Sequence, residues 1–327
     1  MWDENEYIYA VTRVHAREQH LLNSQDIGML TAAADVGEVM RILKEKGWGS
    51  PADGNAGADG LIAAETQKTW SFIQEICGGI PEFSIFRHAN DFHNLKACGK
   101  LAYTEEEGDW NAYCIPFGNV EVEAIVKAVT ERNYSRLPDA LGTAGKRAYE
   151  ILAHTGNGQL FDMALDVAAL EMIWQEGSES KYPLLQTYAR ILVDTANIRA
   201  AVRYQRMGKS REFSDRVIAN GGTLGKKELI SAMGASFEDI CRLLHATPYA
   251  EGIEALRTSM AAFECWSDNL MMEAIRPQRS NYFGIEPLAA FVLGRENEIR
   301  QARLILSAKT NGLSNTALQE RLRVTYA

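Results

Sequence analysis

Apolar residues recur at the spacing of an α-helix along most of this 327-residue chain. The strict alternation of apolar and polar residues that marks a half-buried strand does not occur in convincing form. Only 8 residues are Pro, so few segments contain a helix breaker. The sequence therefore predicts an all-α protein, with helices at residues 6–23, 26–46, 60–77, 81–103, 119–131, 136–155, 158–177, 182–208, 224–245, 249–274, 286–309 and 314–325.

Length and composition narrow the class of protein. A chain of 327 residues is longer than one ordinary domain, which predicts two or three sub-domains. The net charge of −9 argues against a general nucleic-acid binder, because such proteins normally carry a basic patch. No run of 18 apolar residues predicts a membrane span, and the acidic start, Met1 to Glu4, is unlike a signal peptide. Five cysteines without a CxxC pair predict free, mostly buried thiols in a reducing cytosol.

The sequence contains no recognisable catalytic, metal-binding or phosphate-binding motif. The six histidines lack the i,i+4 spacing that places two metal ligands on one helix face. Two segments that end in Gly-Lys, residues 142–146 and 222–226, lack the first Gly and the Ser or Thr of a phosphate-binding loop. We interpret both as turns beside helices. The sequence thus offers no catalytic residue, no metal site and no cofactor site.

One internal repeat has a copy in each half of the chain. Residues 30–48 and 229–249 align when a length difference of two residues is allowed. Each stretch predicts short helices that end in an aromatic residue, Trp48 or Tyr249, just before a break. Such self-similarity is typical of folds built from repeated units.

A second repeated phrase lies inside three predicted helices, at residues 91–96, 194–199 and 295–300. In each, a polar residue precedes an aliphatic residue and then a cation. Three occurrences about 100 residues apart indicate triplication of a helical unit. Asn94 and Asn197, which lie within these phrases, are either core amides with satisfied hydrogen bonds or side chains that line an internal cavity.

The C-terminal stretch resembles the closing signature of the C subunit of the V-type and A-type ATPases, which is called the d subunit in eukaryotes. The resemblance rests on Glu286-Pro287, on Glu296 to Arg300, on Ala308 to Leu313 and on Glu320 to Arg323. The opening Tyr7-Ile8-Tyr9-Ala10-Val11 and the central Gly221-Gly222-Thr223-Leu224 also resemble this family. Arg295 and Ala308 depart mildly from its pattern.

This resemblance implies a funnel of three similar helical lobes around a pseudo-threefold axis. We expect one domain over residues 1–327, with lobes at about 26–118 and 119–219 and the remainder shared between 1–25 and 220–327. The implied function is that of a non-catalytic rotor adaptor in an ATPase that transports protons or sodium ions. Its implied partners are the central-stalk subunits of the D/F type and the membrane rotor ring of the c/K type. The chain would then lie on the cytoplasmic face of the membrane, held there indirectly through the ring.

The repeated phrase and the C-terminal helix also give a candidate partner-binding set. We expect eight side chains to face the funnel interior: Asn94, Lys96, Asn197, Arg199, Glu296, Glu298, Arg300 and Arg303. From the residues alone, the charged side chains of the stretch 296–303 are typical of a solvated, ion-paired helix face. Two other functions stay open from the residues alone, a cytosolic all-helical scaffold and an all-α enzyme without a recognisable motif.

Overall fold

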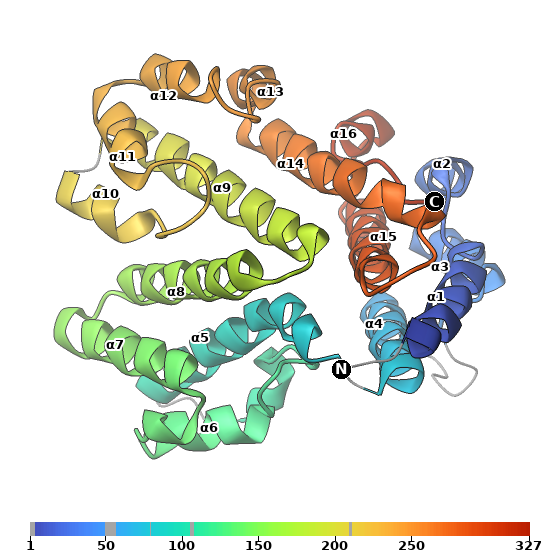
Figure 1. The fold of residues 1–327 in the computed structure, drawn as a ribbon, viewed down its shortest axis with the longest axis horizontal. Helices are drawn as coiled ribbons and strands as arrows, with labels where there is room; N and C mark the ends of the chain where they lie inside the picture. The colour runs from blue at the N-terminus through green and yellow to red at the C-terminus, as the bar shows by residue number, and fades with distance from the viewer. Residues whose placement is uncertain (1–3, 50–56, 79, 105–107, 209–210) are drawn as a thin grey trace. The chain divides into compact units, whose positions relative to one another are not determined.

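The computed structural model describes residues 4–49, 57–78, 80–104, 108–208 and 211–327. These described residues form helices and no strand, so the all-α prediction is confirmed (Figure 1). The helices are α1 (Glu4–Glu18), α2 (Ser24–Ala32), α3 (Val36–Glu45), α4 (Ala58–Cys77), α5 (His88–Thr104), α6 (Val122–Thr130), α7 (Asp139–Thr155), α8 (Gly158–Glu179), α9 (Pro183–Arg206), α10 (Arg211–Val217), α11 (Lys226–Ala235), α12 (Phe237–Leu244), α13 (Gly252–Thr258), α14 (Met260–Ile275), α15 (Glu286–Thr310) and α16 (Asn315–Gln319).

The chain divides into two compact units. Unit 1 contains residues 1–80 and 251–327, and unit 2 contains residues 81–250. Both ends of the chain therefore belong to unit 1. The lobe boundaries expected above stay a prediction.

Unit 1 is organised around α15. This helix packs against α1, α3, α4 and α14. Its apolar residues occupy almost every face, which is the pattern of a helix surrounded by protein. The core beside it includes Leu30, Leu43 and Trp48 from the N-terminal segment and Ile305 and Leu306 from α15 itself. Burying each such side chain stabilises the fold by about 1.5–3 kcal/mol.

Unit 2 is built from long helices that follow one another in the chain. α8 packs against α5, α7 and α9, and successive helices in the run from α7 to α9 point in opposite directions (Figure 1). Its core joins Leu95 of α5, Ile125 of α6, Leu141 of α7 and Leu165 of α8. The loop before α6 is bound by Asn94 of α5, and the loop before α11 is bound by Asn197 of α9.

Helix caps explain where the predicted helices differ from the observed ones. The single helix expected at 26–46 is two helices, because the Asp35 side chain accepts a hydrogen bond from the Glu38 N–H and starts α3 there. Ser236 and Ser259 interrupt the helices expected at 224–245 and 249–274 in the same way. An acceptor at the N-cap satisfies an amide that the helix leaves without a partner. The sequence prediction also missed α10.

One of the two Gly-Lys segments was wrongly predicted as a turn. Residues 142–146 lie inside α7, whereas residues 222–225 form a bend outside any helix and Lys226 begins α11. Gly142 and Gly145 are there because Tyr134 comes close to the helix. A Cβ on Gly142 would lie 2.4 Å from the Tyr134 carbonyl oxygen, and one on Gly145 would lie 2.8 Å from the Tyr134 ring.

The cysteines are free thiols, as the sequence predicted. Cys77, Cys98 and Cys241 are buried, while Cys114 and Cys265 are half-buried. Across the part of the chain that the structure describes, we find no helix both long enough and apolar enough to cross a bilayer.

Candidate functional site

The first copy of the repeated phrase holds a loop against α5. The Asn94 side chain accepts a hydrogen bond from the Ile115 N–H at 2.7 Å and donates one to the Ile115 carbonyl at 2.9 Å. One turn earlier, Asp91 accepts from the Val120 N–H at 3.0 Å and from the Asn119 side-chain amide at 2.9 Å. We call Asp91 and Asn94 with the loop 115–120 the first clamp.

The second copy holds a loop against α9 in the same register. Asn197 accepts from the Ala219 N–H at 2.9 Å and donates to the Ala219 carbonyl at 3.2 Å. Asp194 accepts from the Leu224 N–H at 3.2 Å and from both the backbone and the hydroxyl of Thr223. We call Asp194 and Asn197 with the loop 219–224 the second clamp.

The two clamps match residue by residue. In each, the Asn pairs with the first residue of the loop and the Asp binds the amide five residues later. A glycine lies between them, where a Cβ on Gly118 would lie 2.3 Å from Asp91 Oδ1 and one on Gly222 would lie 2.1 Å from Asp194 Oδ1. Only glycine therefore allows the close approach of loop and helix. Of the two roles left open for the Asn side chains, that of satisfied core amides is confirmed.

The repeat at residues 30–48 and 229–249 ends in aromatic residues that contact the repeated phrases of the long helices. After α11 and α12 the chain brings Tyr249 to the second clamp, where its hydroxyl donates to Asp194 Oδ2 at 2.6 Å. After α2 and α3 it brings Trp48 against α15, where the Arg295 guanidinium lies 5.3 Å from the indole centroid. Arg295 occupies the position in the third phrase that Asp194 occupies in the second. The contact of Trp48 with Arg295 and that of Tyr249 with Asp194 therefore join corresponding positions of the two sequence repeats.

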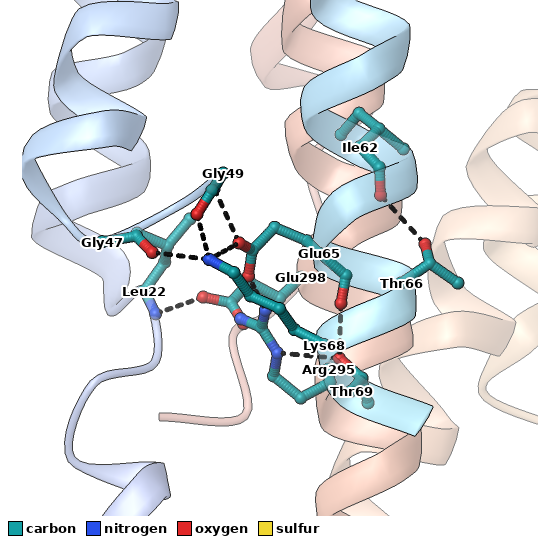
Figure 2. Close-up of polar contacts among 10 residues, drawn as sticks. All are labelled: Leu22, Gly47, Gly49, Ile62, Glu65, Thr66, Lys68, Thr69, Arg295 and Glu298. Atoms are coloured by element: carbon teal, nitrogen blue, oxygen red, sulfur yellow. Dashed lines mark hydrogen bonds and ion pairs between the residues drawn. The ribbon is translucent and has the colours of Figure 1, made fainter. Parts of the chain in front are cut away.

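The third phrase carries a buried ion cluster in place of the Asp and Asn (Figure 2). Arg295 on α15 pairs with Glu65 Oε2 of α4 at 2.5 Å and with the Glu298 carboxylate on its own helix. Glu298 in turn accepts the Leu22 N–H at 2.6 Å, which fixes the segment between α1 and α2. As in the clamps, a side chain of the long helix thus holds the backbone of a loop.

Lys68 extends this ion cluster to a second loop. Its ammonium pairs with Glu65 Oε1 at 2.7 Å and donates to the carbonyls of Gly47 and Gly49 (Figure 2). Glu65 also accepts the Gly49 N–H at 2.8 Å. Neither Glu65 nor Lys68 was predicted from the sequence as a functional residue. The available signal was a carboxylate on the apolar stripe of α4, since Leu61, Ile62 and Glu65 are all buried there.

The eight residues predicted to bind a partner differ in exposure. Asn94 is 0% exposed, Asn197 is 2% exposed, and Glu298 is buried in the ion cluster. Their polar groups are used within the chain. Lys96 pairs with Asp166 at 2.5 Å and Arg300 pairs with Asp268 at 3.0 Å. Arg199 and Glu296 are partly exposed, and Arg303 is exposed.

Glu296 and Arg303 have the most unused polar capacity of the set. Within the described part of the chain, neither side chain has a hydrogen bond or an ion pair. Burial raises the pKa of Glu296 to about 7, although the Arg300 guanidinium one turn away opposes this shift. Near neutral pH this carboxyl group is therefore partly protonated.

His88 lies beside the first clamp, between the carboxylates of Asp91 and Glu176. It is buried, with Nε2 at 2.5 Å from the Glu176 carboxylate and Nδ1 at 3.8 Å from Asp91 Oδ2. Burial alone would lower the pKa of His88, but the nearby carboxylates of Asp91 and Glu176 outweigh it and raise the pKa to about 9. This raised pKa stabilises the fold fully below pH ~6.5, the usual histidine value, and the contribution disappears as the pH rises through 9.

We therefore expect unit 2 to lose up to about 3 kcal/mol of stability between pH ~6.5 and ~9. His88→Gln should be less stable than the parent at pH 6 and should show a flatter dependence over this range. Urea denaturation followed by circular dichroism at several pH values measures both. A parent chain whose unfolding free energy is unchanged from pH 6.5 to 9 would contradict the charged state assigned to His88.

Among the residues described, no group of three or more His, Cys, Asp or Glu side chains is placed to hold a metal ion. The perturbed groups of the clamps and of the ion cluster bind loop backbone and one another. The arrangement can hold helices and loops rigidly, and it offers exposed cations for contact with another protein.

Comparison with known proteins identifies the family to which the chain belongs. The model of the ATP synthase (C/AC39) subunit family matches residues 10–321. The C subunit of the V-type sodium ATPase of Enterococcus hirae is 24% identical over 269 residues, which cover 81% of each chain. The C subunit of the A-type ATP synthase of Methanocaldococcus jannaschii is 22% identical over 348 aligned positions, covering 97% of this chain and 86% of the relative. Its counterpart in Methanococcoides burtonii is 22% identical, and the match covers 97% of this chain and 94% of that relative. The chain belongs to the C/AC39 subunit family of the V-type and A-type rotary ATPases.

Proposed function

We propose that this chain is a non-catalytic adaptor in the central rotor of a V-type or A-type ATPase. It connects the central-stalk subunits of the D/F type to the membrane rotor ring of the c/K type. It lies at the cytoplasmic face of the membrane and is held there through the ring. The observation that carries the proposal is the family match over residues 10–321.

The internal architecture supports a mechanical role. An adaptor that transmits torque has to resist deformation, and close-packed helices with fixed loops do so. Loop segments at Ile115, Ala219 and Leu22 are each bound by a buried polar side chain of a long helix. A buried polar network whose members are all satisfied makes its surroundings rigid.

The repetition also supports three similar lobes around a pseudo-threefold axis. Under this proposal α5, α9 and α15 are equivalent helices, each contributing one copy of the repeated phrase. The clamps of α5 and α9 match residue by residue, and α15 carries the ion cluster at the corresponding residues. The lobe arrangement itself belongs to the proposal.

The partner-binding set is divided by burial under this proposal. Asn94, Asn197 and Glu298 shape the wall by holding its loops. The surface that a stalk protein would contact is provided by the more exposed members, which are Lys96, Arg199, Glu296, Arg300 and Arg303. Four of these five are basic, which favours an acidic partner surface.

Arg303→Glu tests the proposal most directly, because Arg303 is exposed and no described residue pairs with it. We expect the variant chain to bind the purified stalk–ring complex at least about tenfold more weakly, since it meets an acidic surface with a like charge. Lys44→Glu is the matched control, an exposed lysine of unit 1 with the same change in charge. Affinity capture followed by mass spectrometry identifies the bound subunits.

The capture experiment has two outcomes that contradict the proposal. Failure of the parent chain to recover stalk or ring subunits from membranes that contain the ATPase would refute the adaptor role. Equal binding by Arg303→Glu and Lys44→Glu would refute Arg303 as a contact residue while leaving the adaptor role in place.

A further inference from the structure

Unit 1 contains a cavity of about 100 Å³ beside the ion cluster, which we call the Arg17 pocket. It lies where the end of α1, the segment after α3, α4 and α15 meet. Its apolar lining includes the buried rings of Trp48, Phe72 and Phe291. At its edge are Arg17 and His20, which are exposed.

The lining of the Arg17 pocket is basic. Its permanent charges are those of Arg17, Lys46, Lys68 and Arg295, and among the described residues only Glu65 adds an acidic group to the lining. Together with Asp26 and Glu298, which pair with Lys46 and Arg295, these four positive charges face three negative ones and leave an excess of +1, in a chain whose net charge is −9. Such a local concentration of positive charge against apolar walls attracts anions.

Most of these cations are already paired within the chain, and Arg17 is not. Lys46 pairs with Asp26 at 2.6 Å, and Lys68 and Arg295 both pair with Glu65. The Arg17 guanidinium lies 4.4 Å from the centroid of the Phe72 ring. It has no hydrogen bond or carboxylate partner among the residues that the structure describes. Stacking on Phe72 orients its plane and leaves its N–H groups available at the mouth of the pocket.

We propose that the Arg17 pocket binds a small phosphate-type oxyanion, either free in solution or as the headgroup of a lipid. A planar guanidinium binds phosphate through two parallel hydrogen bonds, which an ammonium cannot do. Because ligand pockets for larger molecules have volumes of about 300 Å³ or more, a cavity of about 100 Å³ excludes a nucleotide. The site is independent of the proposed adaptor function, since it lies within one unit and needs no partner protein.

The test uses the full chain and two probes. Inorganic phosphate is titrated by calorimetry at constant ionic strength, with chloride as the reference anion. Phosphatidylcholine vesicles with and without phosphatidic acid are used in a flotation assay. We expect saturable phosphate binding at one site, weakened at least about tenfold in Arg17→Ala because a charge-assisted bidentate contact is lost.

Arg13→Ala is the matched control. Arg13 lies one turn earlier on α1, and its guanidinium also lies over Phe72, at 5.6 Å from the ring centroid. It pairs with Glu75 and does not line the pocket, so phosphate binding should stay within about twofold of the parent. Binding of inorganic phosphate without vesicle binding identifies the free ion as the ligand. Flotation with phosphatidic acid that Arg17→Ala abolishes identifies the headgroup. The proposal is overturned if neither probe binds, or if Arg17→Ala and Arg13→Ala bind equally well.

Discussion

Asp194→Ala is expected to lower the free energy of unfolding of unit 2 by about 3–5 kcal/mol. Asp194 is fully buried and accepts four hydrogen bonds, two from Thr223 and one each from Leu224 and Tyr249. Its removal leaves the Leu224 N–H buried without its carboxylate acceptor and takes away the hydrogen bond that the Tyr249 hydroxyl donates at 2.6 Å, each at about 1–3 kcal/mol. Both burial and the Asp194 carboxylate raise the pKa of Tyr249, so its hydroxyl stays a donor at every accessible pH.

Urea denaturation followed by circular dichroism measures this loss. Asp194→Asn should be less destabilising, because one acceptor oxygen of the same shape remains. Asp215→Ala is the control, since Asp215 is exposed and its ion pair with Lys226 spans 3.5 Å, so we expect a change within about 0.5 kcal/mol. If Asp194→Ala unfolded within about 1 kcal/mol of the parent, the second clamp would not be a stabilising element.

The clamps show which part of the fold could be predicted from the sequence. Helical periodicity predicted α5 and α9, and the repeated phrase identified Asp91, Asn94, Asp194 and Asn197 as members of one pattern. The partner loops were not predicted, because hydrogen bonds to loop backbone leave no side-chain pattern in the loop. The loop sequences gave one signal only. Gly118 and Gly222 lie at matching positions, and each is followed by a residue whose side chain donates a hydrogen bond to the Asp.

Helix breaks were predicted less well than helices. Asp35, Ser236 and Ser259 each start a new helix through one side-chain hydrogen bond, which leaves the apolar period almost undisturbed. The pairing of α15 with α4 could not be predicted either. Periodicity shows that a helix has a buried face, but it does not identify the distant segment that covers it.

The surroundings of the candidate partner-binding residues could not be predicted from the sequence either. Glu298 and Glu296 were both predicted from the repeated phrase and the C-terminal helix to face the funnel interior, yet the two carboxylates have different surroundings. Glu298 is bound by Arg295 and by the Leu22 N–H, whereas Glu296 has neither a hydrogen bond nor an ion pair in the described chain. A charged residue on a helix can be assigned to the interior only when its partners are known, and Leu22 lies 276 residues away from Glu298 in sequence.

Arg295→Met should destabilise unit 1 by about 3–5 kcal/mol, because it leaves two buried carboxylates without their shared cation. Glu65 keeps its ion pair with Lys68, while Glu298 keeps only the Leu22 N–H. Burial already raises the pKa of Glu298, and Arg295 opposes that rise. Without Arg295 the pKa rises further, so the folded variant binds a proton that the unfolded chain releases. The variant should therefore regain stability as the pH falls toward 5 and lose it as the pH rises.

A compensating change separates lost charge pairing from lost packing. Arg295→Met combined with Glu298→Gln removes the unpaired carboxylate and keeps an oxygen for the Leu22 N–H, so at pH 8 the double variant should be more stable than Arg295→Met alone. A buried ion pair replaced by groups of similar volume is often close to neutral, whereas a broken one is not. Urea denaturation of the two variants at pH 5 and pH 8 measures both effects. If the single and double variants unfolded alike at pH 8, the cost would come from the contact of Arg295 with Trp48, and the ion cluster would be dispensable for the stability of unit 1.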